Sequence, residues 1–148
     1  MEPAVLPRPV DLSRPIRVLV VDDNAANREL ARLFLSGVGA EISEATNGSE
    51  AVQMAQALPY DVVLMDIQMP VLDGYGALRQ IRGAQGPNDS TPILAFTANA
   101  DAQSAARLVA AGFDDVVGKP VEPATLIAAV GRAATFTESY DEEVADVC

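Results

Sequence analysis

The sequence predicts an α/β fold in which five parallel strands form one sheet and helices cover both of its faces, a doubly wound (βα)5 arrangement. Short, continuous apolar runs are typical of strands that are buried on both faces, and here they alternate with stretches of helical periodicity. Right-handed crossovers then place the helices on the two faces of the sheet. The length of 148 residues, of which 49% are hydrophobic and 21% charged, fits one domain with its own core.

The first strand and the first helix are predicted from two different patterns of apolar residues. The continuous apolar run Val18-Leu19-Val20-Val21 predicts a buried strand over residues 16–21. Residues 25–38 carry apolar side chains at helical spacing, and glycines at 37 and 39 end that helix. The side chains on the shared helix face are Leu30, Leu33, Phe34 and Val38.

A second strand and helix follow, and then a third strand. Residues 40–45 predict a short strand, and Asn47-Gly48-Ser49-Glu50 resembles a capping box, the hydrogen-bonding pattern that opens a helix. This helix extends to Leu58, because Pro59 stops it. The next apolar run, Val62-Val63-Leu64-Met65, predicts the third strand over residues 61–65.

The second half of the chain repeats the alternation. A turn-rich loop with Pro70, Asp73 and Gly74 follows the third strand, and we expect residues 83–92 to form a polar, mobile loop. The remaining predicted elements are a helix over 75–82, a strand over 93–96, a helix over 101–111, a strand over 115–117 and a helix over 123–132.

Both ends of the chain differ from the predicted domain, which covers residues 16–134. Residues 1–15 hold four prolines and little apolar periodicity, which predicts an extended lead-in or linker. Residues 135–148 carry five acidic and no basic side chains, so we expect a solvated acidic tail. The only cysteine is the last residue of that tail, which rules out an internal disulfide.

The composition restricts the possible partners. A net charge of −11 argues against direct binding of nucleic acid and favours metal ions or basic protein surfaces. The sequence has no histidine, so any chemistry that needs an imidazole requires another molecule or domain. No apolar run is long enough to cross a bilayer, and the first residues lack the pattern of a signal peptide. We therefore expect a cytoplasmic protein without direct membrane insertion.

Four of the predicted strands end at polar residues. The first ends at Asp22 and Asp23, the third at Asp66, the fourth at Thr97 and the fifth at Lys119, the only lysine of the chain. The carboxyl ends of parallel strands share one edge of a sheet, and ligands of open α/β sheets bind at that edge. Three carboxylates, a hydroxyl and an ammonium group are therefore expected to lie together.

Carboxylates that converge in this way need a cation between them. Two unit charges about 5 Å apart repel each other by about 3 kcal/mol at an effective dielectric constant of 20. Oxygen ligands without histidine or cysteine favour Mg²⁺. Asp66 can then act as the nucleophile of a phosphoryl transfer, while Mg²⁺ and Lys119 stabilise charge on the transferred group and Thr97 donates a hydrogen bond to it. A single Asp at such a turn more often caps a helix, but that explanation does not fit the whole set.

Four motifs, in this order, resemble the receiver domain of response regulators in two-component signalling, over residues 16–134. They are Val20-Val21-Asp22-Asp23-Asn24, Leu64-Met65-Asp66-Ile67-Gln68-Met69-Pro70-Val71-Leu72-Asp73-Gly74, Thr97-Ala98-Asn99-Ala100 and Lys119-Pro120. With Asn27-Arg28 after the first motif, the chain is most similar to receivers of hybrid sensor histidine kinases. The resemblance implies a flavodoxin-like fold with strand order 2-1-3-4-5. Whether the chain is a stand-alone regulator or one receiver of a larger kinase stays open.

The resemblance also implies a metal site. Asp23 would bind Mg²⁺ directly and Asp22 largely through water, and Asp66 and the main-chain carbonyl group of Gln68 would complete the protein ligands.

The remaining roles that the resemblance implies concern the phosphoryl group. Asp66 would be the phosphoacceptor, Thr97 and Lys119 would bind the phosphoryl oxygens, and the bond from Lys119 to Pro120 would be cis. The donor would be a phosphohistidine on a histidine kinase or a histidine phosphotransfer protein. Slow self-hydrolysis of the phosphoryl group would follow, and no turnover of a separate small-molecule substrate is expected.

One position departs from the family pattern. Receivers usually have Tyr or Phe three residues before the lysine, and this ring moves inward on phosphorylation, whereas this chain has Val116 there. Phe113 is interpreted as a turn or core residue rather than as a substitute. The departure favours an alternative in which the chain is a protein-docking module whose phosphorylation has little conformational effect. A phosphatase of the haloacid-dehalogenase type would need a second Asp where the chain has Gln68, which argues against that class.

Overall fold

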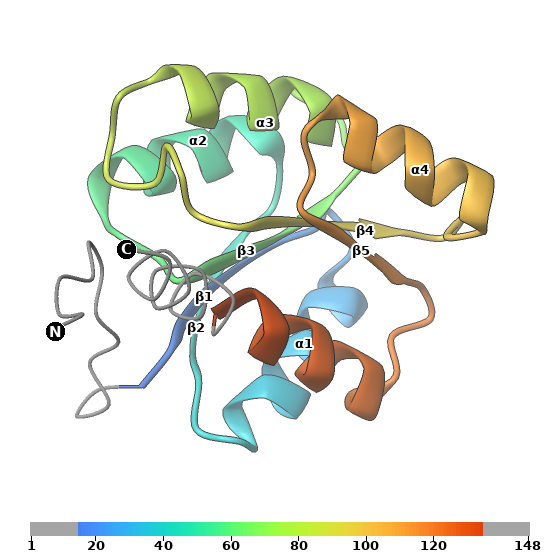
Figure 1. The fold of residues 1–148 in the computed structure, drawn as a ribbon. Coiled ribbons are helices and arrows are strands. Elements are labelled where there is room, and N and C mark those ends of the chain that lie inside the picture. Colours follow the sequence, from blue (N-terminus) through green and yellow to red (C-terminus); the bar gives the residue numbers. More distant parts are fainter. Residues whose placement is uncertain (1–14, 135–148) are drawn as a thin grey trace, which may run out of the picture.

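Five parallel strands form one sheet in the order β2-β1-β3-β4-β5 (Figure 1). The computed structural model describes residues 15–134, so the lead-in and tail predicted for residues 1–14 and 135–148 lie outside the described residues. The strands are β1 (Arg17–Val21), β2 (Glu41–Ala45), β3 (Val62–Asp66), β4 (Ile93–Thr97) and β5 (Asp115–Gly118). The predicted fold class and strand order are confirmed.

Helices connect each strand to the next. They are α1 (Ala25–Ser36), α2 (Gly48–Ala57), α3 (Gly74–Gly83) and α4 (Ala102–Ala111), and a further helix, drawn in red in Figure 1, covers residues 123–134. Figure 1 shows α2, α3 and α4 on one face of the sheet and α1 with the 123–134 helix on the other. The predicted helix over 25–38 ends earlier than expected, because Gly37 caps α1 directly after Ser36.

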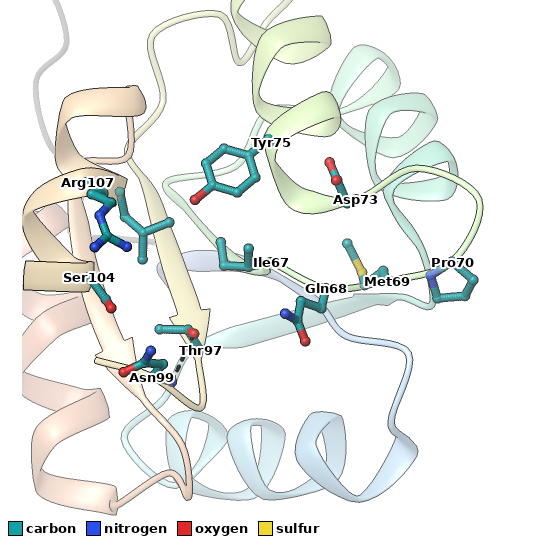
Figure 2. Close-up of a pocket in the computed structure, with 11 residues that line it drawn as sticks. Ile67, Gln68, Met69, Pro70, Asp73, Tyr75, Thr97, Asn99, Ser104 and Arg107 are labelled. Atoms are coloured by element: carbon teal, nitrogen blue, oxygen red, sulfur yellow. Dashed lines mark hydrogen bonds between the residues drawn. The ribbon is translucent and has the colours of Figure 1, made fainter. Parts of the chain in front are cut away.

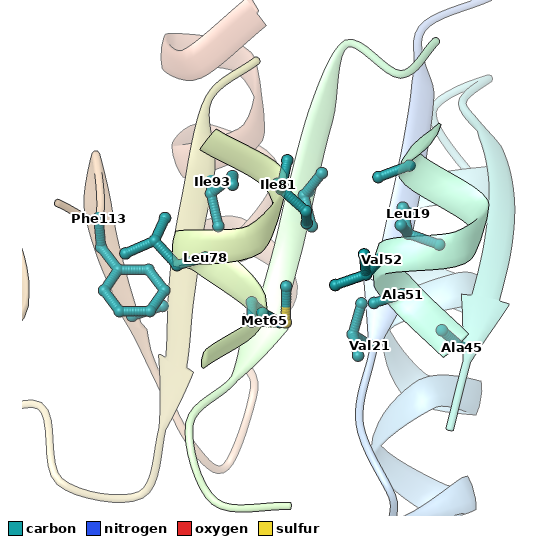
Figure 3. Close-up of a cluster of buried hydrophobic side chains, with 14 of the residues drawn as sticks. Leu19, Val21, Ala45, Ala51, Val52, Met65, Leu78, Ile81, Ile93 and Phe113 are labelled. Carbon is teal, nitrogen blue, oxygen red and sulfur yellow. The ribbon is translucent and has the colours of Figure 1, made fainter. Parts of the chain in front are cut away.

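Side chains of each strand alternate between two cores. Leu19 and Val21 of β1 belong to the core beneath α2, α3 and α4, whereas Val18 and Val20 pack with Ala31 of α1 on the other face. These four side chains of β1 are fully buried. Figure 3 shows the first core, in which Met65 and Ile93 of adjacent strands lie beneath Leu78 and Ile81 of α3. Burial on both faces explains why the strands appear in the sequence as continuous apolar runs.

Polar side chains fix where the helices begin. Asn24, Asn47, Asp73 and Asp101 are the N-caps of the four labelled helices, and each accepts hydrogen bonds from main-chain amides of the first turn. In the expected capping box, Asn47 accepts a bond from the amide of Glu50 at 2.8 Å. Glu50 itself accepts from the main-chain amide of Thr46, one residue earlier than that motif predicts. The helices that begin at the sheet edge are therefore held at their first turns.

The loop after α3 is anchored by buried polar groups. Asn88 is fully buried, and its side-chain amide donates to the carbonyl oxygens of Ala55 and Leu58, at 2.6 Å each. Its side-chain oxygen accepts from the amide of Tyr60 at 2.7 Å and from the hydroxyl of Thr91 at 2.9 Å. The expectation of a mobile polar loop over 83–92 is therefore wrong for Asn88 and Thr91, because satisfied buried hydrogen bonds fix that part of the segment.

Candidate functional site

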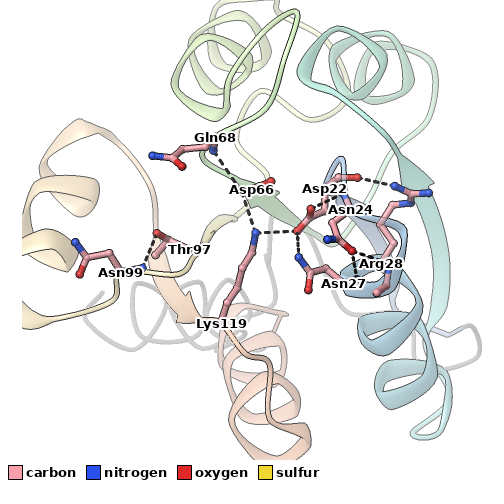
Figure 4. Close-up of polar contacts among 10 residues, drawn as sticks. Asp22, Asn24, Asn27, Arg28, Asp66, Gln68, Thr97, Asn99 and Lys119 are labelled. Carbon is pink, nitrogen blue, oxygen red and sulfur yellow. Dashed lines mark hydrogen bonds and ion pairs between the residues drawn. The ribbon is translucent and has the colours of Figure 1, made fainter.

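The polar residues that end the strands lie together at one edge of the sheet (Figure 4). Asp22 follows β1, Asp66 is the last residue of β3, Thr97 ends β4 and Lys119 follows β5. Asp22, Asp23 and Asp66 each offer a carboxylate oxygen, and these oxygens lie within 4.8 Å of one another. Asp22 and Asp66 are buried, whereas Asp23 is exposed. The topology therefore produces the carboxylate cluster that the strand ends predict.

Lys119 is the cation between two of these carboxylates. Its Nζ lies 3.0 Å from Oδ2 of Asp22 and 3.1 Å from Oδ1 of Asp66. It also lies 4.8 Å from the centre of the Phe96 ring. Burial alone would lower the pKa of Lys119, but the hydrogen bonds to both carboxylates outweigh it and raise the pKa above its ordinary value. The ammonium group therefore stays charged at neutral pH and offsets the repulsion between the two aspartates.

Asp66 is the carboxylate with the most perturbed proton affinity. Burial raises its pKa to about 6, the charge of Asp22 adds to that effect, and the hydrogen bond from Lys119 opposes it. Lys119 and the main-chain amide of Gln68, at 3.3 Å, both donate to the same oxygen, Oδ1. Among the described residues, none has a recorded hydrogen bond to the other oxygen, Oδ2. At neutral pH, Asp66 is thus mostly ionised and more basic than an ordinary aspartate.

Thr97 and Gln68 are the other two predicted site residues beside this cluster. The main-chain amide of Gln68 donates to Asp66, whereas no hydrogen bond joins Thr97 to the Asp66 side chain. The hydroxyl oxygen of Thr97 accepts a hydrogen bond from the amide of Asn99 at 3.1 Å, and the carbonyl oxygen of Thr97 accepts from the amide of Lys119 at 2.8 Å. The peptide bond between Lys119 and Pro120 is cis, as the resemblance implies. Metal binding by the carbonyl group of Gln68 and phosphoryl binding by Thr97 stay predictions.

The donor set fits a small hard cation. The grouped side chains offer carboxylate oxygens only, and the whole sequence contains no histidine that would favour a transition metal. Two of the three carboxylates are buried close together, an arrangement whose repulsion a divalent cation would relieve. The site therefore fits Mg²⁺, with Asp22, Asp23 and Asp66 as the protein side chains that would hold it.

A cavity of about 740 Å³ adjoins the carboxylate cluster (Figure 2). It lies between the loop that leads from β3 into α3, the end of β4 and helix α4, and Asp22, Asp66 and Lys119 are not among its lining residues. The lining residues are Ile67, Gln68, Met69, Pro70, Asp73, Tyr75, Thr97, Asn99, Ser104, Arg107 and Leu108. Gln68, whose main-chain amide donates to Asp66, and Thr97, which follows the residue that pairs in register with Asp66, thus line the cavity beside the carboxylate cluster.

The aromatic residues near this cavity confirm one interpretation from the sequence. Phe113 is buried in the core, and its ring meets that of Tyr75 edge to face, with centroids 5.8 Å apart. Phe113 is therefore a core residue. Val116 is partly buried and packs against the same core, without an aromatic ring to place between β5 and α4. Tyr75, which the sequence did not single out, is the aromatic residue that lines the cavity.

Residues of α1 and β2 also take part in the site. Asn27 contacts the side chain of Asp22, and Arg28 contacts its main chain (Figure 4). Glu44 forms an ion pair with Arg28. The sequence identified Asn27 and Arg28 only as part of a motif and gave Glu44 no role. The position of Asn27 and Arg28 on the first turn of the helix after Asp22 could have indicated that they contact Asp22. The pairing of Arg28 with Glu44 on β2 could not be predicted in this way, because it depends on strand register.

Comparison with known proteins identifies the family. The chain matches the response regulator receiver domain over residues 18–131 and belongs to that family. It is 43% identical over 111 residues to the sensor protein GacS of Pseudomonas syringae pv. syringae, which is 74% of this chain and 12% of that protein. It is 44% identical over 110 residues to the two-component response regulator ORR41 of Oryza sativa subsp. japonica, covering 72% of this chain and 84% of that protein.

Solved structures agree with this assignment. The receiver domain of the sensor histidine kinase PA1611 from Pseudomonas aeruginosa PAO1 superposes with a TM-score of 0.74 at 34% identity, covering 81% of this chain and 98% of that one. That structure has a magnesium ion coordinated in its active-site cleft. The chain spans only about 12% of the length of GacS, so its relatives include much larger proteins. Among the described residues, no helix has the length and apolar character needed to cross a membrane.

Proposed function

We propose that this chain is a phosphorelay receiver, in which Asp66 accepts a phosphoryl group from a phosphohistidine on another protein or domain. The observation that supports this most directly is the placement of Asp66, a buried carboxylate with a pKa of about 6, between two other aspartates and the only lysine. A phosphoryl acceptor needs an ionised nucleophile beside groups that neutralise the incoming charge. Because the sequence has no histidine, the donor imidazole would come from another protein or domain.

The transfer is a displacement at phosphorus. Oδ2 of Asp66, to which no described residue donates a hydrogen bond, attacks the phosphorus atom and forms the P–O bond of an acyl phosphate. The P–N bond to the donor imidazole breaks, and its electron pair stays on the imidazole nitrogen, which takes up a proton. The ammonium group of Lys119 moves from the carboxylate to a phosphoryl oxygen, and the Thr97 hydroxyl turns from the Asn99 amide to donate to another.

A bound Mg²⁺ would neutralise charge on the phosphoryl oxygens, and Asp22, Asp23, Asp66 and the carbonyl group of Gln68 would hold it. Hydrolysis of the acyl phosphate removes the phosphoryl group and ends the signal. Water attacks phosphorus, the P–O bond to Asp66 breaks, and inorganic phosphate and the free carboxylate result. Gln68 and Asn99 line the adjoining cavity, from which we expect that water to reach the phosphoryl group.

The partner and the location follow from the same proposal. The donor is a histidine kinase or a histidine phosphotransfer protein, and the similarity to GacS and to the PA1611 receiver supports a receiver of the hybrid-kinase type. The chain acts in the cytoplasm, where such donors present their phosphohistidine, and it needs neither nucleic acid nor insertion into a membrane.

A second candidate is a docking module in which phosphorylation has little conformational effect, which the side chain of Val116 favours.

The proposal is tested by chemical phosphorylation. The protein is incubated with Mg²⁺ and acetyl phosphate, and intact mass is measured for the natural sequence, for Asp66→Asn and for Asp73→Asn. Asp73 lies in the same loop and caps α3, a role that Asn can also fill, so it is the matched control. We expect one phosphoryl group on the natural sequence and on Asp73→Asn and none on Asp66→Asn. No modification at Asp66 would refute the relay.

A second measurement separates the two candidates. Beryllofluoride is added with Mg²⁺, and amide chemical shifts are recorded along the chain. A relay receiver changes shifts in α4 and β5 as well as at Asp66. A docking module changes shifts only beside Asp66, Thr97 and Lys119.

A further inference from the structure

Asp22 is held from several directions by residues outside the carboxylate cluster. The residue is fully buried. Its carboxylate oxygen Oδ1 accepts a hydrogen bond from the main-chain amide of Asn24 at 2.9 Å, and Oδ2 accepts one from the side-chain amide of Asn27 at 3.2 Å. Donors on both oxygens oppose rotation of the carboxylate, and they remain when Lys119 moves to another partner.

The main chain of Asp22 is held as well. Nη1 of Arg28 donates to the carbonyl oxygen of Asp22 at 2.8 Å, and Nε of the same guanidinium donates to Oε1 of Glu44 at 3.0 Å. Glu44 lies on β2, where it pairs in register with Val20 of β1. One planar side chain from α1 therefore connects the residue after β1 to the neighbouring strand, which a flexible lysine could not do with the same geometry.

We infer that Asn27 and Arg28 are positioning residues that hold Asp22 where it can serve the metal, with Glu44 as the anchor of Arg28. This inference rests on the metal binding that the proposed function includes. Asn27 acts on the carboxylate, and Arg28 acts on the backbone that carries it. Groups that orient a metal ligand in this way change metal affinity about 10- to 100-fold when they are removed.

Arg32 provides a matched control. Its Nε lies 3.3 Å from Oε2 of the same Glu44, so it also links α1 to β2 by an ion pair. No hydrogen bond or ion pair between Arg32 and Asp22 is recorded among the described residues, and the Arg32 side chain is 56% exposed, compared with 15% for Arg28. If the only role of Arg28 were to join helix to strand, loss of either arginine would have similar consequences.

The test measures Mg²⁺ binding rather than activity alone. Isothermal titration calorimetry gives the Mg²⁺ dissociation constant of the natural sequence and of Asn27→Ala, Arg28→Ala and Arg32→Ala, and thermal unfolding without metal shows that each variant is folded. We expect the dissociation constant to rise at least about tenfold for Asn27→Ala and Arg28→Ala and to stay within about twofold for Arg32→Ala. Phosphorylation by acetyl phosphate should then need more Mg²⁺ for half its maximal rate, with a nearly unchanged maximum.

The outcomes are distinct. Folded Asn27→Ala and Arg28→Ala proteins with the natural Mg²⁺ affinity would overturn the inference while the proposed function stands, and so would an equal loss in Arg32→Ala. If Arg28→Ala does not fold, Asn27→Ala decides, because Asn27 is only partly buried and belongs to neither core. No Mg²⁺ binding by the natural sequence would overturn the metal-dependent function and this inference together.

Discussion

Replacement of Asp66 by Asn should stabilise the metal-free protein at neutral pH, and the gain should disappear in acid. Burial raises the pKa of Asp66 from 3.8 to about 6. A carboxyl group whose pKa is higher in the folded state costs nothing well below pH 4, where both states are protonated. Its destabilising effect grows between about pH 4 and pH 6, where only the unfolded state is ionised, and is complete above about pH 6. Because a tenfold change in proton affinity is worth about 1.4 kcal/mol, the full cost is about 3 kcal/mol.

Asn isolates the effect of charge. It has nearly the shape of Asp, and its side-chain oxygen can still accept hydrogen bonds from Lys119 and from the amide of Gln68. Only 4% of Asp66 is exposed, so solvent screening reduces the effect little.

The assay is urea unfolding of both proteins in the presence of a chelator, between about pH 4 and pH 8. Far-ultraviolet circular dichroism follows the transition, since the chain has no tryptophan. The free energy of unfolding should be similar for the two proteins at about pH 4, and the Asn variant should be more stable by up to about 3 kcal/mol at pH 7 and above. A difference that does not vary with pH, or a natural sequence more stable than the variant at pH 7, would refute the assigned electrostatics.

Two other substitutions test the site. Lys119→Ala removes the cation beside Asp22 and Asp66, so the pKa of Asp66 should rise further, by about 1 to 3 pH units. Phosphorylation by acetyl phosphate at pH 7 should therefore slow, while Mg²⁺ still binds. An unchanged pH profile of the phosphorylation rate would contradict this role. Gly74→Ala would bring a Cβ into the carbonyl oxygen of Asp66 and should cost about 1 to 3 kcal/mol of unfolding free energy, measured in urea. Gly83→Ala in the same helix, where a Cβ meets no atom within 4 Å, is the control and should not destabilise.

The sequence predicted the sheet well because burial on both faces leaves a clear pattern. All five strands appear within a residue or two of the expected ranges, and strand order followed from the resemblance. The gathering of Asp22, Asp66 and Lys119 was predictable for a physical reason, since parallel strands end at the same edge.

Contacts that depend on register between distant segments were not predictable in the same way. Arg28 binds Glu44 because β1 and β2 pair with Val20 opposite Glu44, and no local pattern contains that information. The buried position of Asn88 was unpredictable for the same reason. A polar residue in a polar stretch predicts an exposed loop, and only the positions of Ala55 and Tyr60 show that its amide replaces main-chain partners inside the fold.

Val116 bears on the conformational response to phosphorylation and not on the assembly of the site itself. Asp66, Lys119 and the other carboxylates are assembled without any contribution from a ring on β5. Phe113 is buried in the core against Tyr75. A change that begins when Thr97 leaves the Asn99 amide therefore has no aromatic side chain of β5 to displace. We expect such a change to act through the cavity that Thr97 shares with α4, where Leu108 and Tyr75 form part of the wall. If the chain is a relay receiver, we therefore expect phosphorylation of Asp66 to change the α4 surface by repacking of that cavity rather than by rotation of a β5 ring.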